Sequence, residues 1–145
     1  MKIIYYSSWL LFRIISKFVF RIKVSGQQHI PKKSGFILAT NHISYYDPII
    51  VGSWINRQIY FLAKKELFKN KFFAWILKGT NSLPVRRGGF DRKALELSIN
   101  VITNGNGLTF FPEGTRSKTD NFLDPKPGIG MIAIKAKCPV IPGYI

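Results

Sequence analysis

Short hydrophobic runs alternate along the chain with longer stretches whose apolar residues have helical spacing. The runs predict five strands, at residues 35–40, 59–63, 82–86, 107–111 and 139–144. The helical stretches predict helices at residues 49–55, 65–77, 92–103 and 128–137. This alternation is typical of an α/β domain, in which helices cover a central sheet. We therefore expect a single α/β domain with a mixed β-sheet flanked by helices.

Two of the predicted helices have clear start signals. Asp47 and Pro48 predict a helix with Asp47 as its N-cap and proline in its first turn. Asp91 is expected to cap the helix at residues 92–103, and Gly105 follows that helix as a stop signal.

Residues 1–24 have a different pattern, because basic residues occur there without a single acidic one. Residues 3–12 form an uncharged run, which is too short for a membrane-spanning helix of roughly 20 residues. No small-residue cleavage site follows this run, so we do not expect a signal peptide. We predict that the segment is an amphipathic helix that lies at the membrane interface and precedes the domain at residues 25–145.

The two sides of this predicted helix differ in polarity. Its polar side carries Arg13, Ser16, Lys17, Arg21 and Lys23. Its apolar side carries Ile14, Ile15, Phe18, Val19 and Ile22. Nearby aromatic rings, which favour the lipid headgroup boundary, are Tyr5, Tyr6 and Trp9. The alternative is a helix that packs on its own domain and leaves a basic face in solvent.

The charge balance indicates a polyanionic partner. The chain has 22 Lys and Arg residues against 7 Asp and Glu residues, a formal net charge of +15. Nucleic acid and an anionic membrane surface are the two candidates. The basic residues are spread along the chain and no nucleic-acid-binding motif occurs, so we favour the membrane surface and expect no nucleic-acid partner. The single cysteine, Cys138, excludes an internal disulfide and a cysteine-rich metal site.

His42 and Asp47 are the first candidate site residues. His42 directly follows a predicted strand, and Asp47 comes five residues later at the start of a helix. A short loop can bring the carboxylate to one imidazole nitrogen and leave the other nitrogen free to take a proton from a hydroxyl. The alternative is that Asp47 only caps its helix and that His42 is an ordinary loop residue.

Two further loops carry charged side chains after strands. Residues 110–117 (FFPEGTRS) combine an acid, a glycine, a hydroxyl and an arginine, which suits an anion and hydroxyl site. The alternative is a turn with a local ion pair between Glu113 and Arg116. Arg86 and Arg87 follow another strand; one should point into a cleft and one into solvent, unless both are simply solvated. Sites in open α/β sheets collect at the carboxyl ends of strands, so we expect these loops to meet.

The motifs resemble those of the PlsC-like glycerolipid acyltransferases, a family that includes 1-acylglycerol-3-phosphate acyltransferases. Residues 41–47 (NHISYYD) resemble the first family motif, in which four residues separate His from Asp. The second, third and fourth motifs are similar to residues 79–87, 111–117 and 140–142. The four occur in family order, from about residue 35 onward. Arg86 is a departure, because the family often has an acid or asparagine just before the arginine of its second motif.

The resemblance implies direct acyl transfer to a hydroxyl from the thioester of acyl-CoA or acyl-carrier protein, with no cofactor, metal or covalent acyl-enzyme. His42 would deprotonate the hydroxyl, and Asp47 would orient His42. Cys138 does not fall on a catalytic position of the family and is expected to pack in an apolar stretch.

The same resemblance implies an acceptor and its binding residues. The acceptor would be 1-acylglycerol-3-phosphate (lysophosphatidic acid), converted to phosphatidic acid by acylation of its sn-2 hydroxyl. Arg87, Glu113 and Arg116 would bind its phosphate and glycerol part, and Gly114 and Thr115 would shape the loop. We expect the protein at the cytoplasmic face of the cell membrane, as a peripheral or monotopic protein.

Other interpretations stay open at this point. The acceptor could be glycerol-3-phosphate or another lysolipid, or the chain could be a non-catalytic binder of lipid or nucleic acid. The chain also stops at Ile145, inside or just after an apolar strand, whereas family members usually continue beyond the fourth motif. We therefore expect that the acyltransferase domain is incomplete at its C-terminus.

Overall fold

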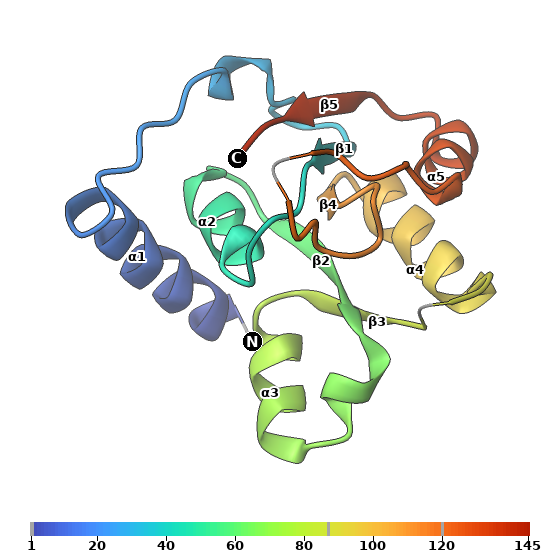
Figure 1. Cartoon of the computed structure of the whole chain (residues 1–145), viewed down its shortest axis with the longest axis horizontal. Helices are drawn as coiled ribbons and strands as arrows, with labels where there is room; N and C mark the ends of the chain where they lie inside the picture. The colour runs from blue at the N-terminus through green and yellow to red at the C-terminus, as the bar shows by residue number, and fades with distance from the viewer. Residues whose placement is uncertain (1, 87, 120) are drawn as a thin grey trace.

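The computed structural model describes residues 2–86, 88–119 and 121–145, and its centre is a five-stranded sheet (Figure 1). The strands are β1 (Phe36–Thr40), β2 (Ile59–Lys64), β3 (Ser82–Val85), β4 (Gly107–Phe110) and β5 (Val140–Gly143). Their order across the sheet is β3-β2-β4-β1-β5, and every pairing among them is parallel. The prediction of a mixed sheet was therefore wrong. The intervening helices return the chain to the same end of the sheet, and such crossovers produce parallel pairs.

The helices alternate with the strands as the hydrophobic pattern predicted. They are α1 (Lys2–Phe18), α2 (Asp47–Trp54), α3 (Lys71–Gly79), α4 (Arg92–Thr103) and α5 (Gly128–Ala136). Two short 3-10 helices are η1 (Gln27–His29) and η2 (Lys65–Phe68). The single helix predicted at residues 65–77 is divided into η2 and α3. The division lies at Asn70, whose side-chain oxygen caps α3 by accepting hydrogen bonds from the N–H groups of Phe72 and Phe73.

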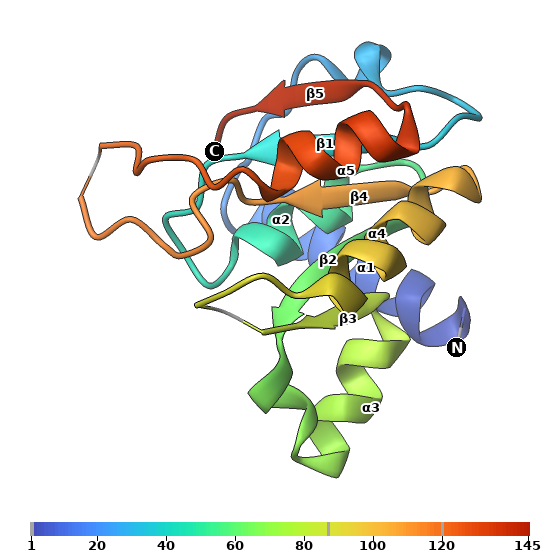
Figure 2. The ribbon, with the colours of Figure 1, turned by 90° about the vertical axis from the view of Figure 1, so that its right-hand side faces the viewer.

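The sheet is covered on both faces by apolar side chains. On the α2 face, the buried cluster consists of Phe36, Leu38, Val51, Ile55, Ile59 and Phe61. On the face of α4 and α5, it consists of Ile37, Leu95, Ile102, Leu108 and Ile132. Figure 2 shows α4 and α5 in front of the sheet and α1 and α2 behind it. Burial on both faces explains why the central strands are hydrophobic throughout rather than alternating.

Helix α1 packs on α2 through its more polar side. The indole N–H of Trp9 donates to the carbonyl of Ile55 at 3.0 Å, and that of Trp54 donates to Ser16 Oγ at 2.9 Å. Arg13 donates to Asn56 Oδ1 at 2.6 Å and lies over the Trp9 ring. Ser16 is 3% exposed, so the prediction that it lies on an outer polar side was wrong.

The outer side of α1 is apolar. Its exposed hydrophobic residues are Ile3, Leu10, Leu11, Ile14 and Phe18. The helix ends at Phe18, and Arg21 has a left-handed backbone (φ 51°), so Arg21 and Lys23 do not extend a basic helical face as predicted. The alternative prediction, a helix that packs on its own domain, is thus correct about the packing. It is wrong about the exposed side, which is hydrophobic rather than basic. None of the helices in the described ranges is long and apolar enough to cross a membrane.

The strand order decides which loops meet. β1 and β4 are neighbours in the sheet, with Ala39 opposite Phe110 near their carboxyl ends. The loop from β1 to α2 and the loop from β4 to α5 therefore leave the sheet side by side. Residues 41–46 and 111–117 lie in these two loops, and Asp47 begins the helix that follows the first loop.

Candidate active site

The imidazole of His42 and the carboxylate of Asp47 are in contact. His42 Nδ1 lies 2.8 Å from Asp47 Oδ2. An ionised carboxylate only accepts hydrogen bonds, so Nδ1 carries the proton and Nε2 is left with its lone pair. Within the described ranges, no hydrogen bond of His42 Nε2 is found. The pair therefore has the geometry that a general base requires, with one nitrogen held and the other free.

The Asp47 side chain accepts hydrogen bonds from the loop before α2 rather than from the first turn of α2. It is the first residue of α2, and Tyr46, the residue at the N-cap position, forms no side-chain capping bond. Asp47 Oδ2 instead accepts hydrogen bonds from the backbone N–H groups of Ile43 and Ser44, each at 2.8 Å. The prediction of Asp47 as N-cap was wrong, because a carboxylate at 1% exposure is used to fold the preceding loop around His42. Three donors on one oxygen fix the carboxylate in place.

The loop after β4 closes over the same histidine. The ring of Phe111 stacks on the His42 ring, with centroids 4.2 Å apart and planes 24° apart. Glu113 Oε1 accepts from the backbone N–H of His42 at 2.9 Å, and the backbone N–H of Ser117 donates to the His42 carbonyl at 2.7 Å. His42 is thus held by its ring, its N–H and its carbonyl, and its exposed fraction is only 8%.

Glu113 connects two backbone segments. Its other oxygen, Oε2, accepts from the backbone N–H of Leu123 at 3.2 Å, and the residue is 5% exposed. No ion pair between Glu113 and Arg116 is found among the described residues, so the alternative of a local pair in this turn was wrong. The contacts of Glu113 are those of a residue that positions the His42 loop. Its predicted contact with the acceptor stays a prediction.

Arg116 lies on an aromatic ring. Its guanidinium carbon is 3.3 Å from the centre of the Tyr45 ring, and Tyr45 is itself 75% exposed. Stacking on an aromatic face holds the guanidinium plane while its N–H groups stay available to an anion. Gly114, two residues earlier, has φ 69°, a left-handed conformation that favours glycine, and Thr115 is exposed.

The third basic loop is held by Asp91. The backbone N–H of Arg86 donates to Asp91 Oδ2 at 2.8 Å, and that of Ala94 donates to Oδ1 at 3.1 Å. These two bonds lower the pKa of the Asp91 carboxyl, the first more than the second. Asp91 thus caps α4 as predicted and also fixes the end of the Arg86 loop, where the Arg86 side chain is exposed. Arg87, the other predicted arginine, lies outside the described residues.

Two contacts of the site were not predicted as such. Asn41 Nδ2 donates to the carbonyl of Ile145 at 3.1 Å, and the N–H of Ile145 donates to Asn41 Oδ1 at 2.8 Å. The Asn41 amide therefore extends the ladder between β1 and β5 by one step, next to His42. The second contact is the stacking of Phe111. Both residues belong to the motifs at residues 41–47 and 111–117, but neither was assigned a role from the sequence.

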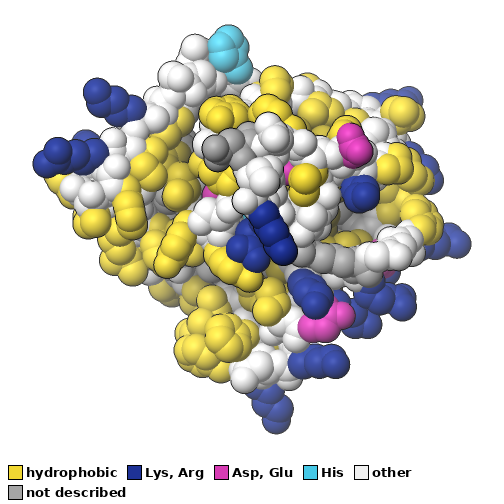
Figure 3. Space-filling view, in the orientation of Figure 1, with side chains coloured by type: hydrophobic (Ala, Val, Ile, Leu, Met, Phe, Trp, Pro, Cys, Tyr) yellow, Lys and Arg dark blue, Asp and Glu magenta, His cyan; other side chains and the backbone are white. Residues whose placement is uncertain are grey.

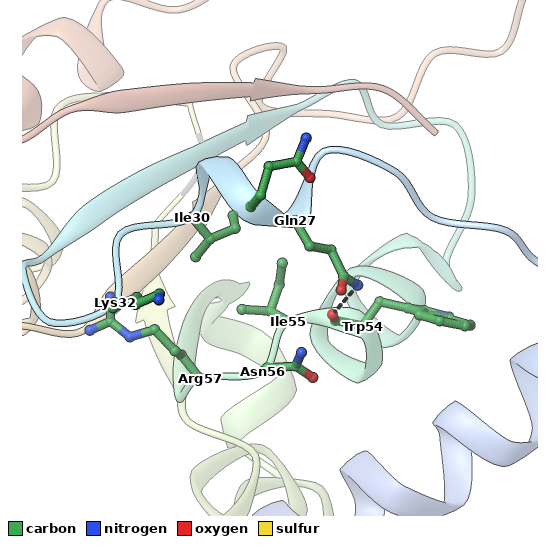
Figure 4. A pocket seen from close by; sticks show the side chains of 8 residues that line it. Gln27, Ile30, Lys32, Trp54, Ile55, Asn56 and Arg57 are labelled. Atoms are coloured by element: carbon green, nitrogen blue, oxygen red, sulfur yellow. Dashed lines mark hydrogen bonds between the residues drawn. The ribbon is translucent and has the colours of Figure 1, made fainter.

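Two hollows lie at opposite ends of the domain. One, of about 120 Å³, adjoins the site and is lined by Asn41, Ile43, Glu113, Ser117, Asn121, Phe122 and Tyr144. The other, of about 280 Å³, lies at the far end of α2, where Gln27 Nε2 donates to the Trp54 carbonyl at 2.7 Å (Figure 4). Its walls, which include Ile30, Ile55 and Arg57, contain none of the candidate site residues. The chemistry therefore points to the smaller hollow.

Cys138 is half-buried, and burial raises the pKa of its thiol. A thiol with a raised pKa forms less of the reactive thiolate. It packs against the cluster on the side of α4 and α5, as predicted.

Comparison with known proteins identifies the family. The sequence model of the family described as Acyltransferase matches residues 21–145. This chain belongs to that acyltransferase family. Its relatives include the 1-acyl-sn-glycerol-3-phosphate acyltransferase of Bacillus subtilis, which is 35% identical over 122 residues, 83% of this chain and 60% of the relative. The protein of the same name from Streptococcus pneumoniae is 32% identical over 128 residues, 82% of this chain and 47% of the relative.

A solved structure agrees with the assignment. The crystal structure of the 1-acyl-sn-glycerophosphate acyltransferase PlsC from Thermotoga maritima matches with a TM-score of 0.73 and 28% identity, over 94% of this chain and 64% of that chain. The resemblance to the PlsC-like acyltransferases is therefore confirmed. The chain spans about half to three-fifths of the length of the two bacterial relatives.

Proposed function

We propose that this protein transfers a fatty acyl group from a thioester, acyl-CoA or acyl-carrier protein, to the sn-2 hydroxyl of 1-acylglycerol-3-phosphate. The observation that carries the proposal is the 2.8 Å contact between His42 Nδ1 and Asp47 Oδ2, which leaves Nε2 as a base. The relatives named for this reaction support the choice of acceptor. The acyl donor is a substrate, and the proposed reaction uses no cofactor.

In the proposed reaction, His42 Nε2 takes the proton of the acceptor hydroxyl as its oxygen attacks the thioester carbonyl. Asp47 stabilises the imidazolium that forms. The tetrahedral intermediate then collapses, the carbon–sulfur bond breaks, and the imidazolium returns the proton to the departing thiolate. A base placed in this way contributes about 10²- to 10⁴-fold to the rate.

The acceptor phosphate is proposed to bind the cationic loops. Arg116 supports this assignment, because its guanidinium is stacked on Tyr45 and is not paired with an acid of the described ranges. A planar guanidinium offers paired N–H donors to phosphate oxygens. Arg87 is proposed for the same role from its place in the second motif, with Arg86 beside it. Glu113 contributes by holding the His42 backbone, and Gly114 and Thr115 shape the turn before Arg116.

We further propose that residues 1–24 bind an anionic membrane surface and that residues 25–145 carry the acyltransferase site. The exposed apolar side of α1 supports this role, because Leu10, Ile14 and Phe18 are each about half exposed or more. The net charge of +15 favours anionic lipid, and nucleic acid is not proposed as a partner. The proposed location is the cytoplasmic face of the membrane, where both thioester donors occur.

The test is acceptor-dependent thiol release from oleoyl-CoA on vesicles that contain lysophosphatidic acid. Wild type should release thiol only with acceptor present, and His42→Ala should lower the rate by about 10²-fold or more while it folds and binds vesicles normally. The same assay with acyl-carrier protein as donor, and with glycerol-3-phosphate or another lysolipid as acceptor, distinguishes the substrates. Equal rates in wild type and His42→Ala with every donor and acceptor would refute the proposed mechanism.

A further inference from the structure

Helix α3 exposes a row of aromatic side chains. Phe72, Phe73 and Trp75 are 63%, 54% and 58% exposed. We call these three residues the aromatic ridge. The Phe72 ring centroid lies 6.0 Å from that of Phe73 and 6.5 Å from that of Trp75, so the three rings form one cluster. An apolar cluster of this size on a surface indicates a binding site.

The ridge borders the part of α3 that packs on α1. Gly79 comes seven residues after Phe72 and therefore lies on the same side of the helix, and it is so close to Ile4 of α1 that a side chain at Gly79 would overlap it. Ile76 and Leu77 are partly buried. Lys71 and Lys78 lie together on the other side, so α3 is amphipathic, and its apolar side extends beyond the part that packs on α1. An apolar helix side left exposed at the surface indicates that a lipid phase or a partner covers it.

Basic residues surround the ridge. Exposed lysines flank it on both sides along the chain, at Lys65, Lys69, Lys71 and Lys78. The one acid within residues 64–80, Glu66, lies 3.9 Å from the Lys64 ammonium. Aromatic rings bordered by lysines match the chemistry of an anionic lipid interface, where rings enter the headgroup layer and ammonium groups meet phosphates.

The ridge continues the apolar side of α1. The two helices are in contact at Ile4 and Gly79, and Figure 3 shows hydrophobic side chains that extend along one edge of the molecule from α1 to α3. Two helices that present apolar residues along one edge can meet a flat surface together. One helix alone would leave the domain free to rotate about it.

We propose that the aromatic ridge of α3 is a second contact with an anionic lipid bilayer, which acts with α1 to set the orientation of the domain on the membrane. This inference rests on the proposed binding of α1 to the membrane surface, and it adds α3 as a second helix in that contact. Because β2 leads directly into η2 and α3, docking of the ridge places the carboxyl ends of the strands at a fixed angle to the lipid.

The test compares vesicle binding of wild type with that of Phe72→Ser/Trp75→Ser. Both side chains are more than half exposed, so the variant should fold, as circular dichroism would check. On vesicles of equal parts phosphatidylglycerol and phosphatidylcholine, we expect the apparent dissociation constant to rise by about tenfold or more. The matched control is Phe90→Ser/Ile134→Ser, which removes two side chains of 71% and 77% exposure away from the ridge and should bind as wild type does.

Three outcomes would overturn the proposal. The ridge variant could bind as tightly as wild type, or both double variants could lose the same affinity. Alternatively, wild type could self-associate in light scattering and the ridge variant could be monomeric with unchanged vesicle binding, which would assign the ridge to a second copy of the chain.

A separate assay keeps this inference apart from the proposed enzyme activity. With acceptor dispersed in detergent, the ridge variant should release thiol at the wild-type rate, because no bilayer is needed. Absence of acyl transfer by wild type in that assay would count against the proposed function and leave the vesicle result intact.

Discussion

The loop around His42 and the outer sides of α1 and α3 depart from ordinary surface chemistry in opposite directions. In the first region, acids and a histidine are buried, and each is hydrogen-bonded. In the second, large apolar side chains such as Phe18 and Trp75 are more than half exposed. Buried polar groups and exposed apolar patches are the two informative exceptions to the usual distribution. The buried, hydrogen-bonded groups around His42 indicate a rigid reaction site. The exposed apolar side chains of α1 and α3 indicate a surface that a lipid phase covers.

The largest expected effect is on catalysis, from Asp47→Asn. The amide can still accept from the loop backbone through its oxygen, but it no longer stabilises an imidazolium on His42. We expect kcat to fall by about 10²- to 10⁴-fold, with a far smaller change in the free energy of unfolding. Steady-state thiol release and denaturant unfolding measure the two quantities. A variant with nearly normal kcat would show that the buried pair is structural only.

Glu113→Gln tests whether the buried acid positions the loop or binds substrate. Its two carboxylate oxygens accept from His42 N–H and Leu123 N–H, and a glutamine can accept at only one of these places. One buried donor is then left unpaired, at a cost of about 1–3 kcal/mol in the free energy of unfolding.

The kinetic result separates the two roles of Glu113. A positioning role predicts a lower kcat for every acceptor, because His42 moves. A direct role in acceptor binding predicts instead a raised KM that depends on the phosphate of the acceptor, with stability close to that of wild type.

For the exposed apolar surface, the double variant Leu10→Ser/Ile14→Ser should weaken the binding of α1 to vesicles. Both side chains are about half exposed, so stability should change little. Loss of two interfacial side chains is expected to raise the dissociation constant for anionic vesicles by about tenfold. Co-sedimentation measures it, with Phe90→Ser/Ile134→Ser as the matched control. Unchanged binding would remove α1 from the proposed membrane contact.

The smallest expected effect is that of Tyr45→Ala, which removes the ring under Arg116. A cation–π contact at an exposed site contributes about 0.5–1 kcal/mol, so KM for a phosphate-bearing acceptor should rise by a few-fold with kcat unchanged. Tyr45→Phe keeps the ring and should behave as wild type. If Tyr45→Phe is as impaired as Tyr45→Ala, the hydroxyl is important and the stacking is not.

Much of the fold was predictable because its signals are local. Strands β1 and β4 are apolar runs of a length that indicates burial, and Asp91 caps α4 as its position suggested. The division at Asn70 was missed, because the single apolar periodicity of residues 65–77 concealed a local signal, the N-cap formed by the Asn70 side chain. The mixed sheet was also a wrong expectation, since strand direction depends on how the chain crosses over and not on any single strand.

The site was predictable in part. The spacing of His42 and Asp47 indicated their pairing, and the structure brings the two side chains together. The buried clamp by Glu113 and the stacking of Phe111 on His42 could not be predicted, because their partners are about 70 residues away along the chain. For the same reason, the burial of Ser16 against α2 could not be predicted, whereas Ile14 and Phe18 were correctly placed on an apolar side of the helix.

By itself, the sequence of this protein determined which residues form strands and helices and which short motifs carry chemistry. Both depend on residues within a few positions of one another, through hydrophobic periodicity, capping and turn formation. Only the tertiary structure decided which loops meet, which oxygens of Asp47 and Glu113 are occupied, and which sides of α1 and α3 are exposed. These properties depend on the parallel strand order, which pairs Phe36 of β1 with Gly107 of β4, about half of the chain away, and is set by packing of the whole domain.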